Sequence, residues 1–213
     1  MKPSIQSITL TALLALALLP APLATAADSA ERAAIVKEKI RNLRAECAAT
    51  RNQVTLTLEE LSRLAVPGVE LRPQFDKYKA ELVKMEEKAK GTRERSVSMR
   101  EKGHAFFSDW EQQTKEIRNE DIRKEALKRL DKRRKSYNKI LSASEEAREQ
   151  FVPFMSDLND VRKLLESELS ASTVASTKGL IRQANWHGED VKESLLDMEK
   201  ELDRVAAELA KYE

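Results

Sequence analysis

The chain has 213 residues, of which 35% are charged, with 38 Lys plus Arg against 36 Asp plus Glu and a net charge of +2. This near balance argues against a nucleic-acid-binding protein, which would carry a strong basic excess. Only five glycines and six prolines occur and aromatic residues make up 5%, a composition that favours long helices over a β-sandwich or barrel.

The start of the chain has the layout of a secretory signal peptide. Lys2 is the only charged residue before Asp28, and residues 8–19 form an apolar run. Small residues then define a cleavage site made up of Ala24, Ala26 and Ala27. An uncleaved membrane anchor is the alternative, but the apolar run is shorter than the roughly 20 residues of a spanning helix. We expect residues 1–26 to be removed and the remainder to be exported, to the periplasm or another extracytoplasmic compartment.

Residues 27–213 are expected to form a single domain, because core-type residues recur along them at alternating spacings of three and four. The four stripes run from Val36 to Leu64, Phe75 to Ile117, Ile122 to Leu165 and Val174 to Tyr212. A repeat of about 3.5 residues is the seam of a coiled coil or of a coiled-coil-like bundle. We therefore predict an all-α protein, an elongated antiparallel bundle of about four helices with the first shorter than the others. The expected helices are at about 28–64, 73–118, 119–167 and 172–212.

Turn and capping residues separate these stripes. A Pro-Gly pair at 67–68 ends the first helix, and Pro73 suits the first turn of the second because its missing N–H needs no partner there. Asn119 offers a cap for the third helix, followed by two acidic residues that favour its positive end. Val174 follows Leu165 by nine positions, which breaks the repeat. This third boundary is left open between a chain reversal and a kinked continuous helix.

Few residues of the chain are candidates for catalysis or metal binding. His104 and His187 are the only histidines, and neither belongs to a metal-binding spacing or a nucleophile motif. Cys47 is the only cysteine and lies on the first stripe, where a cysteine packs as a small hydrophobe. An intermolecular disulfide is the alternative for this thiol. No catalytic residue, metal ligand or cofactor is therefore predicted.

Two glycines and a proline stand inside expected helices. Gly103 and Gly188 occupy stripe positions, although glycine there costs about 1 kcal/mol relative to alanine. The interpretation is a close helix approach or a slot for a neighbour's aromatic ring. The alternative is a small apolar pocket, or a local bend, that a ligand could use. Pro153 predicts a kink in the third helix.

The third helix also contains a dense basic run. Such a run is usually a solvated face paired with acids of a neighbouring helix. The alternative is contact with an anionic surface, such as lipid headgroups or envelope polymers. The candidate contact residues are Lys128, Arg129, Lys132, Arg133, Arg134 and Lys135.

Three segments carry a family resemblance: the aromatic-rich Trp-Glu segment 105–111, the basic segment 133–137 and the proline-containing segment 152–158. Through them the chain resembles a bacterial family catalogued as domain of unknown function 2959, which implies an exported, all-helical protein with no established activity. The family's Lys-His-Asn-Leu-Asn-Ala stretch falls at 166–171, where this chain reads Glu-Ser-Glu-Leu-Ser-Ala. A role tied to that histidine or those asparagines therefore does not carry over.

The leading hypothesis of function is a non-enzymatic, exported helical bundle that serves as a cell-envelope scaffold or protein-interaction module. It implies a protein partner or self-association, and no nucleic acid or transmembrane helix. One alternative is a peripheral protein that binds an anionic membrane surface through the basic run. The other is a small-ligand carrier that uses the region of Gly103 and Gly188.

Overall fold

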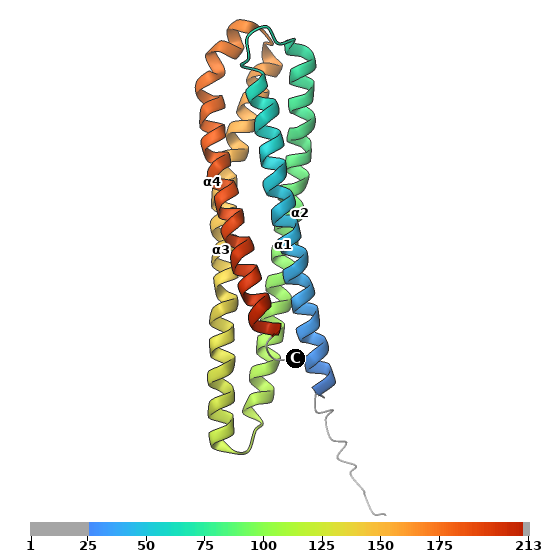
Figure 1. Ribbon diagram of the computed structural model, residues 1–213, viewed down its shortest axis with the longest axis vertical. Helices are drawn as coiled ribbons and strands as arrows, with labels where there is room; N and C mark the ends of the chain where they lie inside the picture. The colour runs from blue at the N-terminus through green and yellow to red at the C-terminus, as the bar shows by residue number, and fades with distance from the viewer. Residues whose placement is uncertain (1–25, 211–213) are drawn as a thin grey trace, which may run out of the picture.

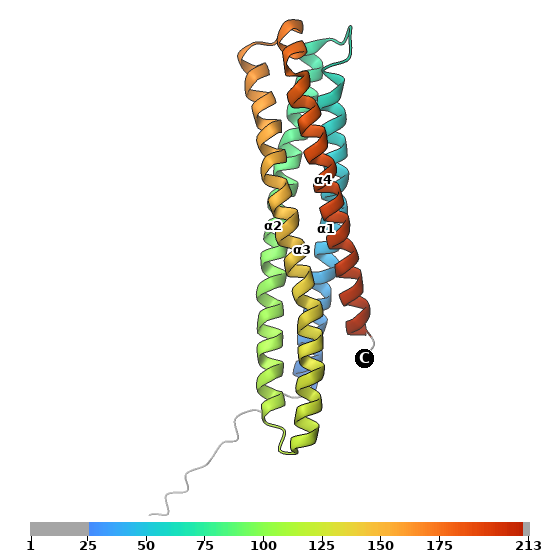
Figure 2. The same ribbon diagram turned by 90° about the vertical axis from the view of Figure 1, so that its left-hand side faces the viewer.

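The computed structural model describes residues 26–210, which form four α-helices and contain no β-strand. The helices are α1 (Ala26–Arg63), α2 (Leu71–Lys115), α3 (Glu120–Ser167) and α4 (Ala171–Ala210). They lie side by side in an elongated rod (Figure 1, Figure 2). The predicted all-α bundle is confirmed.

Each helix packs on two neighbours, in the cyclic order α1, α2, α3, α4 and back to α1. The connections from α1 to α2 and from α3 to α4 lie at one end of the rod, and the connection from α2 to α3 lies at the other (Figure 1). Neighbouring helices therefore run antiparallel, as short connections between helices require.

The observed helix ends agree with the expected ones to within three residues. The third boundary is a chain reversal at residues 168–170, and α3 continues through Pro153 as one helix. Pro73 is the third residue of α2 and therefore lies in its first turn, as expected. Ala26 and Ala27 are the first two residues of α1, while Ala24 and the rest of the expected signal segment lie outside the described residues. Residues 211–213 lie outside them as well.

Turn and cap residues act as their chemistry predicts. Gly68, which follows α1, has a φ of 80°, a conformation that costs glycine little. The Asn119 side chain accepts a hydrogen bond of 3.1 Å from the Ile122 N–H and so caps α3. At the start of α4, the Ser170 hydroxyl oxygen accepts from the Thr173 N–H at 3.1 Å.

The predicted stripes form the core over most of the rod. All residues of the first stripe from Val36 to Leu64 are buried, as are the stripe residues of α4 from Ile181 to Val205. Two tyrosines span neighbouring helices: the Tyr78 hydroxyl donates to the Leu158 carbonyl oxygen at 2.6 Å and the Tyr137 hydroxyl to that of Met99 at 2.7 Å. These bonds satisfy polar groups that would otherwise be unpaired inside the core.

The stripe prediction is wrong at the end of the rod where α2 connects to α3. Four stripe residues of α2 are only half-buried there, namely Phe106, Trp110, Gln113 and Ile117. Phe107 and Thr114 are buried instead. In α3, Ile122 is 59% exposed rather than in the core.

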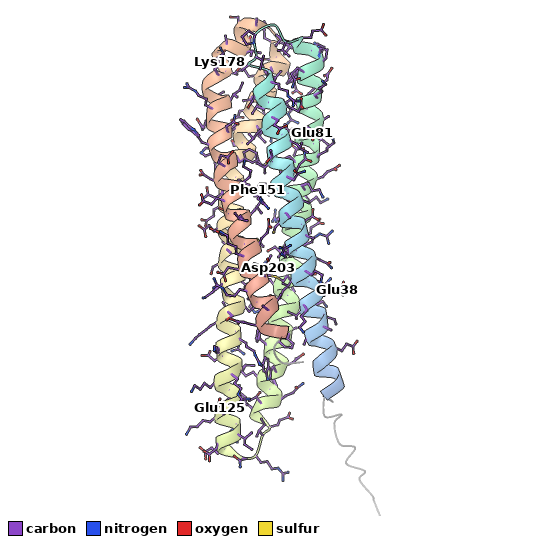
Figure 3. All side chains as sticks on the ribbon, viewed as in Figure 1. Glu38, Glu81, Glu125, Phe151, Lys178 and Asp203 are labelled. Atoms are coloured by element: carbon purple, nitrogen blue, oxygen red, sulfur yellow. The ribbon has the colours of Figure 1, made fainter. Side chains whose placement is uncertain are left out.

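Unequal helix lengths explain this difference. The first helix was expected to be the one short helix, but α4 with 40 residues is also shorter than α2 with 45 and α3 with 48. The contacts of Gln183 and His187 with Asp157 set the register of α4 on α3 and place Ala210 beside about Lys132. The first turns of α3, roughly 18 Å of helix, therefore extend past the end of α4. In Figure 3, Glu125 accordingly lies well beyond the level of Asp203.

Candidate interaction site at the end of α2 and the start of α3

We call residues 103–137 the distal end; they comprise the last turns of α2, the α2–α3 connection and the first turns of α3. The centre of the distal end is a group of aromatic rings from two helices. The Phe106 and Trp110 centroids lie 5.6 Å apart within α2, and the Phe107 ring lies 5.3 Å from the ring of Tyr137 on α3. Tilted and edge-on contacts at such distances are favourable between aromatic rings. The two helices are thus joined at the distal end by aromatic packing.

Gly103 makes this approach of the two helices feasible. A Cβ atom at residue 103 would overlap the phenol oxygen and ring carbons of Tyr137. The interpretation of Gly103 as a slot for a neighbour's aromatic ring is confirmed, although the ring comes from α3 rather than from the nearby α2 residues.

Gly188 has the same role between other helices. A Cβ atom there would lie 2.5 Å from Leu58 Cδ1 and 3.1 Å from Phe154 Cε2. The space beside each glycine is therefore filled by the protein's own side chains. The small-ligand pocket considered for Gly103 and Gly188 is not present at these two positions.

Two arginines of α3 contact α2. The Arg133 guanidinium carbon lies 4.8 Å from the centroid of the Trp110 ring, a cation–π contact. Arg134 Nη2 donates to Glu111 Oε2 at 2.6 Å. Glu111 also pairs with Lys115 at 2.7 Å. The hydrogen bond from Lys115, and to a smaller extent that from Arg134, lowers the pKa of the Glu111 carboxyl group to about 2.

A groove of about 520 Å³ lies beside these contacts. It is lined by one residue of α2 and six of α3, namely Trp110, Asp121, Ile122, Glu125, Ala126, Arg129 and Arg133. The lining thus combines an aromatic ring and two apolar side chains with four charged side chains.

The groove lies on the same face of α3 that contacts α4 along the rest of the rod. Ile122 and Arg129 stand a whole number of heptads before Asp157, and Ala126 and Arg133 stand a whole number of heptads before Phe154. Residues separated by whole heptads share one face of a supercoiled helix. Asp157 bonds to α4, and Phe154 packs beside Gly188 of α4. The groove is therefore the α4-binding face of α3, extended beyond the last described residue of α4.

The basic run is spread around α3 and does not form one surface. Arg133 and Arg134 contact α2, as described above. Arg129 pairs with Glu125 at 3.3 Å and Lys135 with Asp131 at 2.9 Å, both within α3. Lys128 and Lys132 are exposed. Successive helical residues point about 100° apart, so these six candidates separate into groove, interhelix and solvent positions.

The two histidines take different positions. His187 Nδ1 lies 2.7 Å from Asp157 Oδ2, and Gln183 Nε2 donates to the other oxygen of the same carboxylate at 3.1 Å. His104 is exposed on α2. Over residues 26–210, no group of three or more His, Cys, Asp and Glu side chains is placed to hold a metal ion.

Sequence reasoning missed the groove itself. It assigned Trp110 and Ile122 to the core because their spacing fits the stripe. Their spacing is indeed that of a core face, but the described part of α4 does not reach far enough along α3 to cover them. A signal was present in the stripe lengths, since the fourth stripe is shorter than the second and third.

These features define the protein as an antiparallel four-helix bundle with a partly uncovered distal end. A family model described as Protein of unknown function (DUF2959) matches residues 27–210, and the chain belongs to this family. The resemblance read from the three segments is thereby confirmed. Two of those segments, 105–111 and 133–137, meet at the distal end.

No curated protein and no solved structure matches the chain. Between residues 26 and 210, none of the helices has an apolar stretch long enough to span a membrane.

Proposed function

We propose that this protein is an exported helical bundle that acts without catalysis in the cell envelope, as a scaffold or protein-interaction module. We further assign the distal groove as its contact with a protein partner. The observation that carries the proposal is the α4-binding face of α3, which continues beyond Ala210 with its apolar side chains uncovered.

The groove has the chemistry of a helix-binding surface. Its lining includes Trp110, Ile122 and Ala126, and the Ile122 side chain is 59% exposed. An amphipathic helix that lies in such a groove buries apolar residues at spacings of three and four. Tryptophan and arginine are the residue types that contribute most to binding at protein interfaces, and Trp110 and Arg133 occupy the groove together. The expected occupant is thus a helix.

The polar side chains inside the bundle support an interaction role over a catalytic one. Thr50 and Thr92 bond to each other at 2.7 Å, and Gln53 Nε2 donates to Glu81 Oε2 at 2.7 Å. Each pair joins α1 to α2, and neither lines the groove. These groups hold helices together, and the groove contains charged and apolar groups suited to recognition.

Export rests on the N-terminal sequence, where Lys2, the apolar run 8–19 and the small residues around Ala26 follow the signal-peptide layout. The alternative of binding an anionic membrane surface through the basic run has less support. Four of its six residues contact an acidic side chain or an aromatic ring of the same chain, namely Arg129, Arg133, Arg134 and Lys135.

Cell fractionation tests the location. Cells that naturally produce the protein are separated into cytoplasmic, soluble extracytoplasmic and envelope fractions, and the envelope pellet is washed with high salt. We expect the protein outside the cytoplasm with a mature N-terminus at Ala27. Release from the pellet by salt would favour the anionic-surface alternative, because salt screens such contacts. Recovery in the cytoplasm with Met1 intact would contradict the proposal.

Site-specific photo-crosslinking tests the groove. A photoreactive phenylalanine analogue at Ile122 is expected to crosslink to a protein partner in intact cells. The same analogue at Val152, which is 64% exposed on α3 outside the groove, is the matched control. Protein adducts at Ile122 and none at Val152 are expected. Equal adducts at both residues, or none at either, would count against the groove as the contact.

A further inference from the structure

The charges along the groove follow a fixed order. On the α3 side, Asp121 and Glu125 come first, near the α2–α3 connection, and Arg129 and Arg133 follow toward the middle of the rod. The apolar residues Ile122 and Ala126 lie among them. One half of this face is therefore acidic and the other half basic.

Such a face is complementary to a second copy of itself when the two helices run antiparallel. α4 runs antiparallel to α3 (Figure 1), and a helix that continues the line of α4 in the same direction is antiparallel to α3 as well. A two-fold axis perpendicular to the rod generates that arrangement for a second α3. Self-complementarity is what an isologous interface requires. The acidic half of each helix then faces the basic half of the other.

We propose that two copies of this protein associate end to end through their distal grooves. Residues 121–133 of α3 in each copy then lie in the groove of the other copy, on the part of α3 that α4 leaves uncovered. This inference rests on the proposed function, because it names the partner of the same groove. The interface joins two rods into one longer rod.

The stripe spacing sets the pairing between the helices. With Ile122 opposite Arg133 of the partner subunit, Ala126 falls opposite Arg129 of the partner subunit. The small side chain of Ala126 then leaves room for the long side chain of Arg129 of the partner subunit. Glu125 comes within reach of Arg129 of the partner subunit, and the symmetry repeats this contact.

Within one chain, Arg129 pairs with Glu125, but the two side chains are 66% and 54% exposed. An exposed ion pair within one helix contributes little, so exchanging it for a contact between copies costs little. Arg133 keeps its place over the Trp110 ring, which presents the aliphatic part of the side chain to the partner.

The order of the charges along the groove favours a second copy of this chain over an unrelated helix as the occupant.

Charge exchange between two variants tests the proposal. The protein is purified from cells expressing its complete coding sequence, and its mass is followed by analytical ultracentrifugation. We expect a dimer of the unaltered protein at about 100 μM. Glu125→Arg places two arginines opposite two arginines, and Arg129→Glu places acids opposite acids. Each single variant should weaken association about tenfold at each of two symmetric contacts, or roughly a hundredfold.

Mixing the two variants is the decisive step. Glu125→Arg and Arg129→Glu copies are complementary to each other at both symmetric contacts, so the mixture should form heterodimers although neither variant dimerises alone. The matched control is the pair Glu145→Arg and Arg148→Glu, an exposed ion pair on the same helix outside the groove. These two variants should each dimerise as the unaltered protein does.

A third variant, Ile122→Ser, removes the exposed apolar contact without touching the core. It should weaken the dimer and leave unchanged the unfolding temperature measured at a concentration too low for dimerisation. An unaltered protein that stays monomeric up to about 1 mM, or a dimer indifferent to both charge reversals, would overturn the inference.

The experiments can overturn self-association and the proposed envelope role independently of each other. Photo-crosslinking at Ile122 that yields only adducts with a different protein, together with a monomer in solution, would overturn self-association and leave the interaction role intact. A dimer whose variants behave as described, in a protein found only in the cytoplasm, would overturn the envelope role and leave self-association intact.

Discussion

Tyr137 of α3 occupies the space above Gly103 of α2, and its hydroxyl donates to the Met99 carbonyl oxygen one turn earlier in α2. The ring is buried and also contacts Phe107. Burial raises the pKa of the Tyr137 phenol, so the hydroxyl keeps its proton and remains a donor. The approach of α2 to α3 at the distal end thus depends on the absence of a side chain at residue 103.

Gly103→Ala is expected to destabilise the protein despite the higher helix propensity of alanine. The added Cβ overlaps the phenol of Tyr137, and a ring in a packed core cannot move without strain of about 1–3 kcal/mol. The propensity gain is about 1 kcal/mol and offsets only part of this cost. The free energy of unfolding, measured by urea denaturation followed by circular dichroism, should fall.

Gly179→Ala is the matched control. A Cβ atom at residue 179 in α4 meets nothing within 4 Å, so only the propensity gain remains and the free energy of unfolding should rise by about 0.5–1 kcal/mol. If both alanine variants were more stable than the unaltered protein, the tight packing of Tyr137 on Gly103 would be wrong.

Cys47 is expected to resist thiol reagents in the folded protein. Its side chain is fully buried, with its sulfur 3.7 Å from the sulfur of Met198. Burial, with smaller effects of Glu199 and Glu46, raises the thiol pKa to about 12. At pH 8 the reactive thiolate is therefore about 10⁻⁴ of the total. Reaction with Ellman's reagent should be slow in buffer and immediate in denaturant.

Ser142→Cys supplies the control, because residue 142 is exposed on α3. This variant should release one equivalent rapidly and the second only on unfolding. Rapid reaction of the unaltered protein would show that Cys47 reaches solvent and would favour the intermolecular disulfide considered from the sequence.

Glu111 makes the distal end sensitive to acid. Its pKa of about 2 lies below the ordinary value of 4.5, because Lys115 and then Arg134 donate to the charged form. A carboxyl group whose pKa is lowered by folding stabilises the folded state above the unfolded pKa. This contribution is complete above about 4.5 and is lost as the pH falls toward 2.

Carbon-detected NMR titration of the Glu111 carboxyl group measures this pKa directly. The midpoint should lie near 2 in the unaltered protein. It should rise in Arg134→Gln, where Lys115 remains, and rise further when Lys115→Gln is added. A midpoint unmoved by Arg134→Gln would mean that the ion pair between α2 and α3 does not form in solution.

Periodicity was sufficient to predict most of the core, since a side chain such as Leu43 or Val191 is buried wherever four helices lie together. Turn chemistry was sufficient for the ends, as the Asn119 cap shows. Both signals are local, because each depends on residues within about two turns of a single helix.

The distal groove could not be predicted in the same way. Whether Trp110 and Ile122 are covered depends on where α4 ends relative to α3, which is a relation between helices distant in sequence. Residues that α4 covers and residues that it leaves uncovered have the same spacing along a stripe, so the spacing does not distinguish them. The basic run was likewise read as one candidate surface, whereas the helical rotation sends Arg134 to Glu111 and leaves Lys132 exposed.

The spacing also could not predict which hydrogen bonds the polar residues on the stripes make. Thr50 of α1 and Thr92 of α2 are both buried, and their hydroxyl oxygens lie 2.7 Å apart. The Thr92 hydroxyl donates to the Lys88 carbonyl oxygen at 2.9 Å. A hydroxyl has one proton, so Thr50 must be the donor between the two threonines.

Because Thr50 is the donor and Thr92 the acceptor, valine substitutions at the two residues should have unequal effects on stability. Thr92→Val leaves the Thr50 proton without its partner in the core and should lower the free energy of unfolding by about 1–3 kcal/mol. Thr50→Val leaves Thr92 its bond to Lys88 and should cost less. The double variant, which removes both hydroxyls, should be more stable than Thr92→Val alone, because replacing both partners with apolar groups is nearly neutral.

A double-mutant cycle on the free energy of unfolding measures the coupling between the two threonines. Thr50→Val combined with Thr177→Val is the control, because the buried Thr177 hydroxyl bonds to the Thr173 and Val174 carbonyl oxygens of its own helix. That pair should be additive within about 0.5 kcal/mol. Thr50 and Thr92 should instead show a coupling of about 1 kcal/mol, and additivity there would mean that the bond between α1 and α2 contributes nothing to holding the two helices in register.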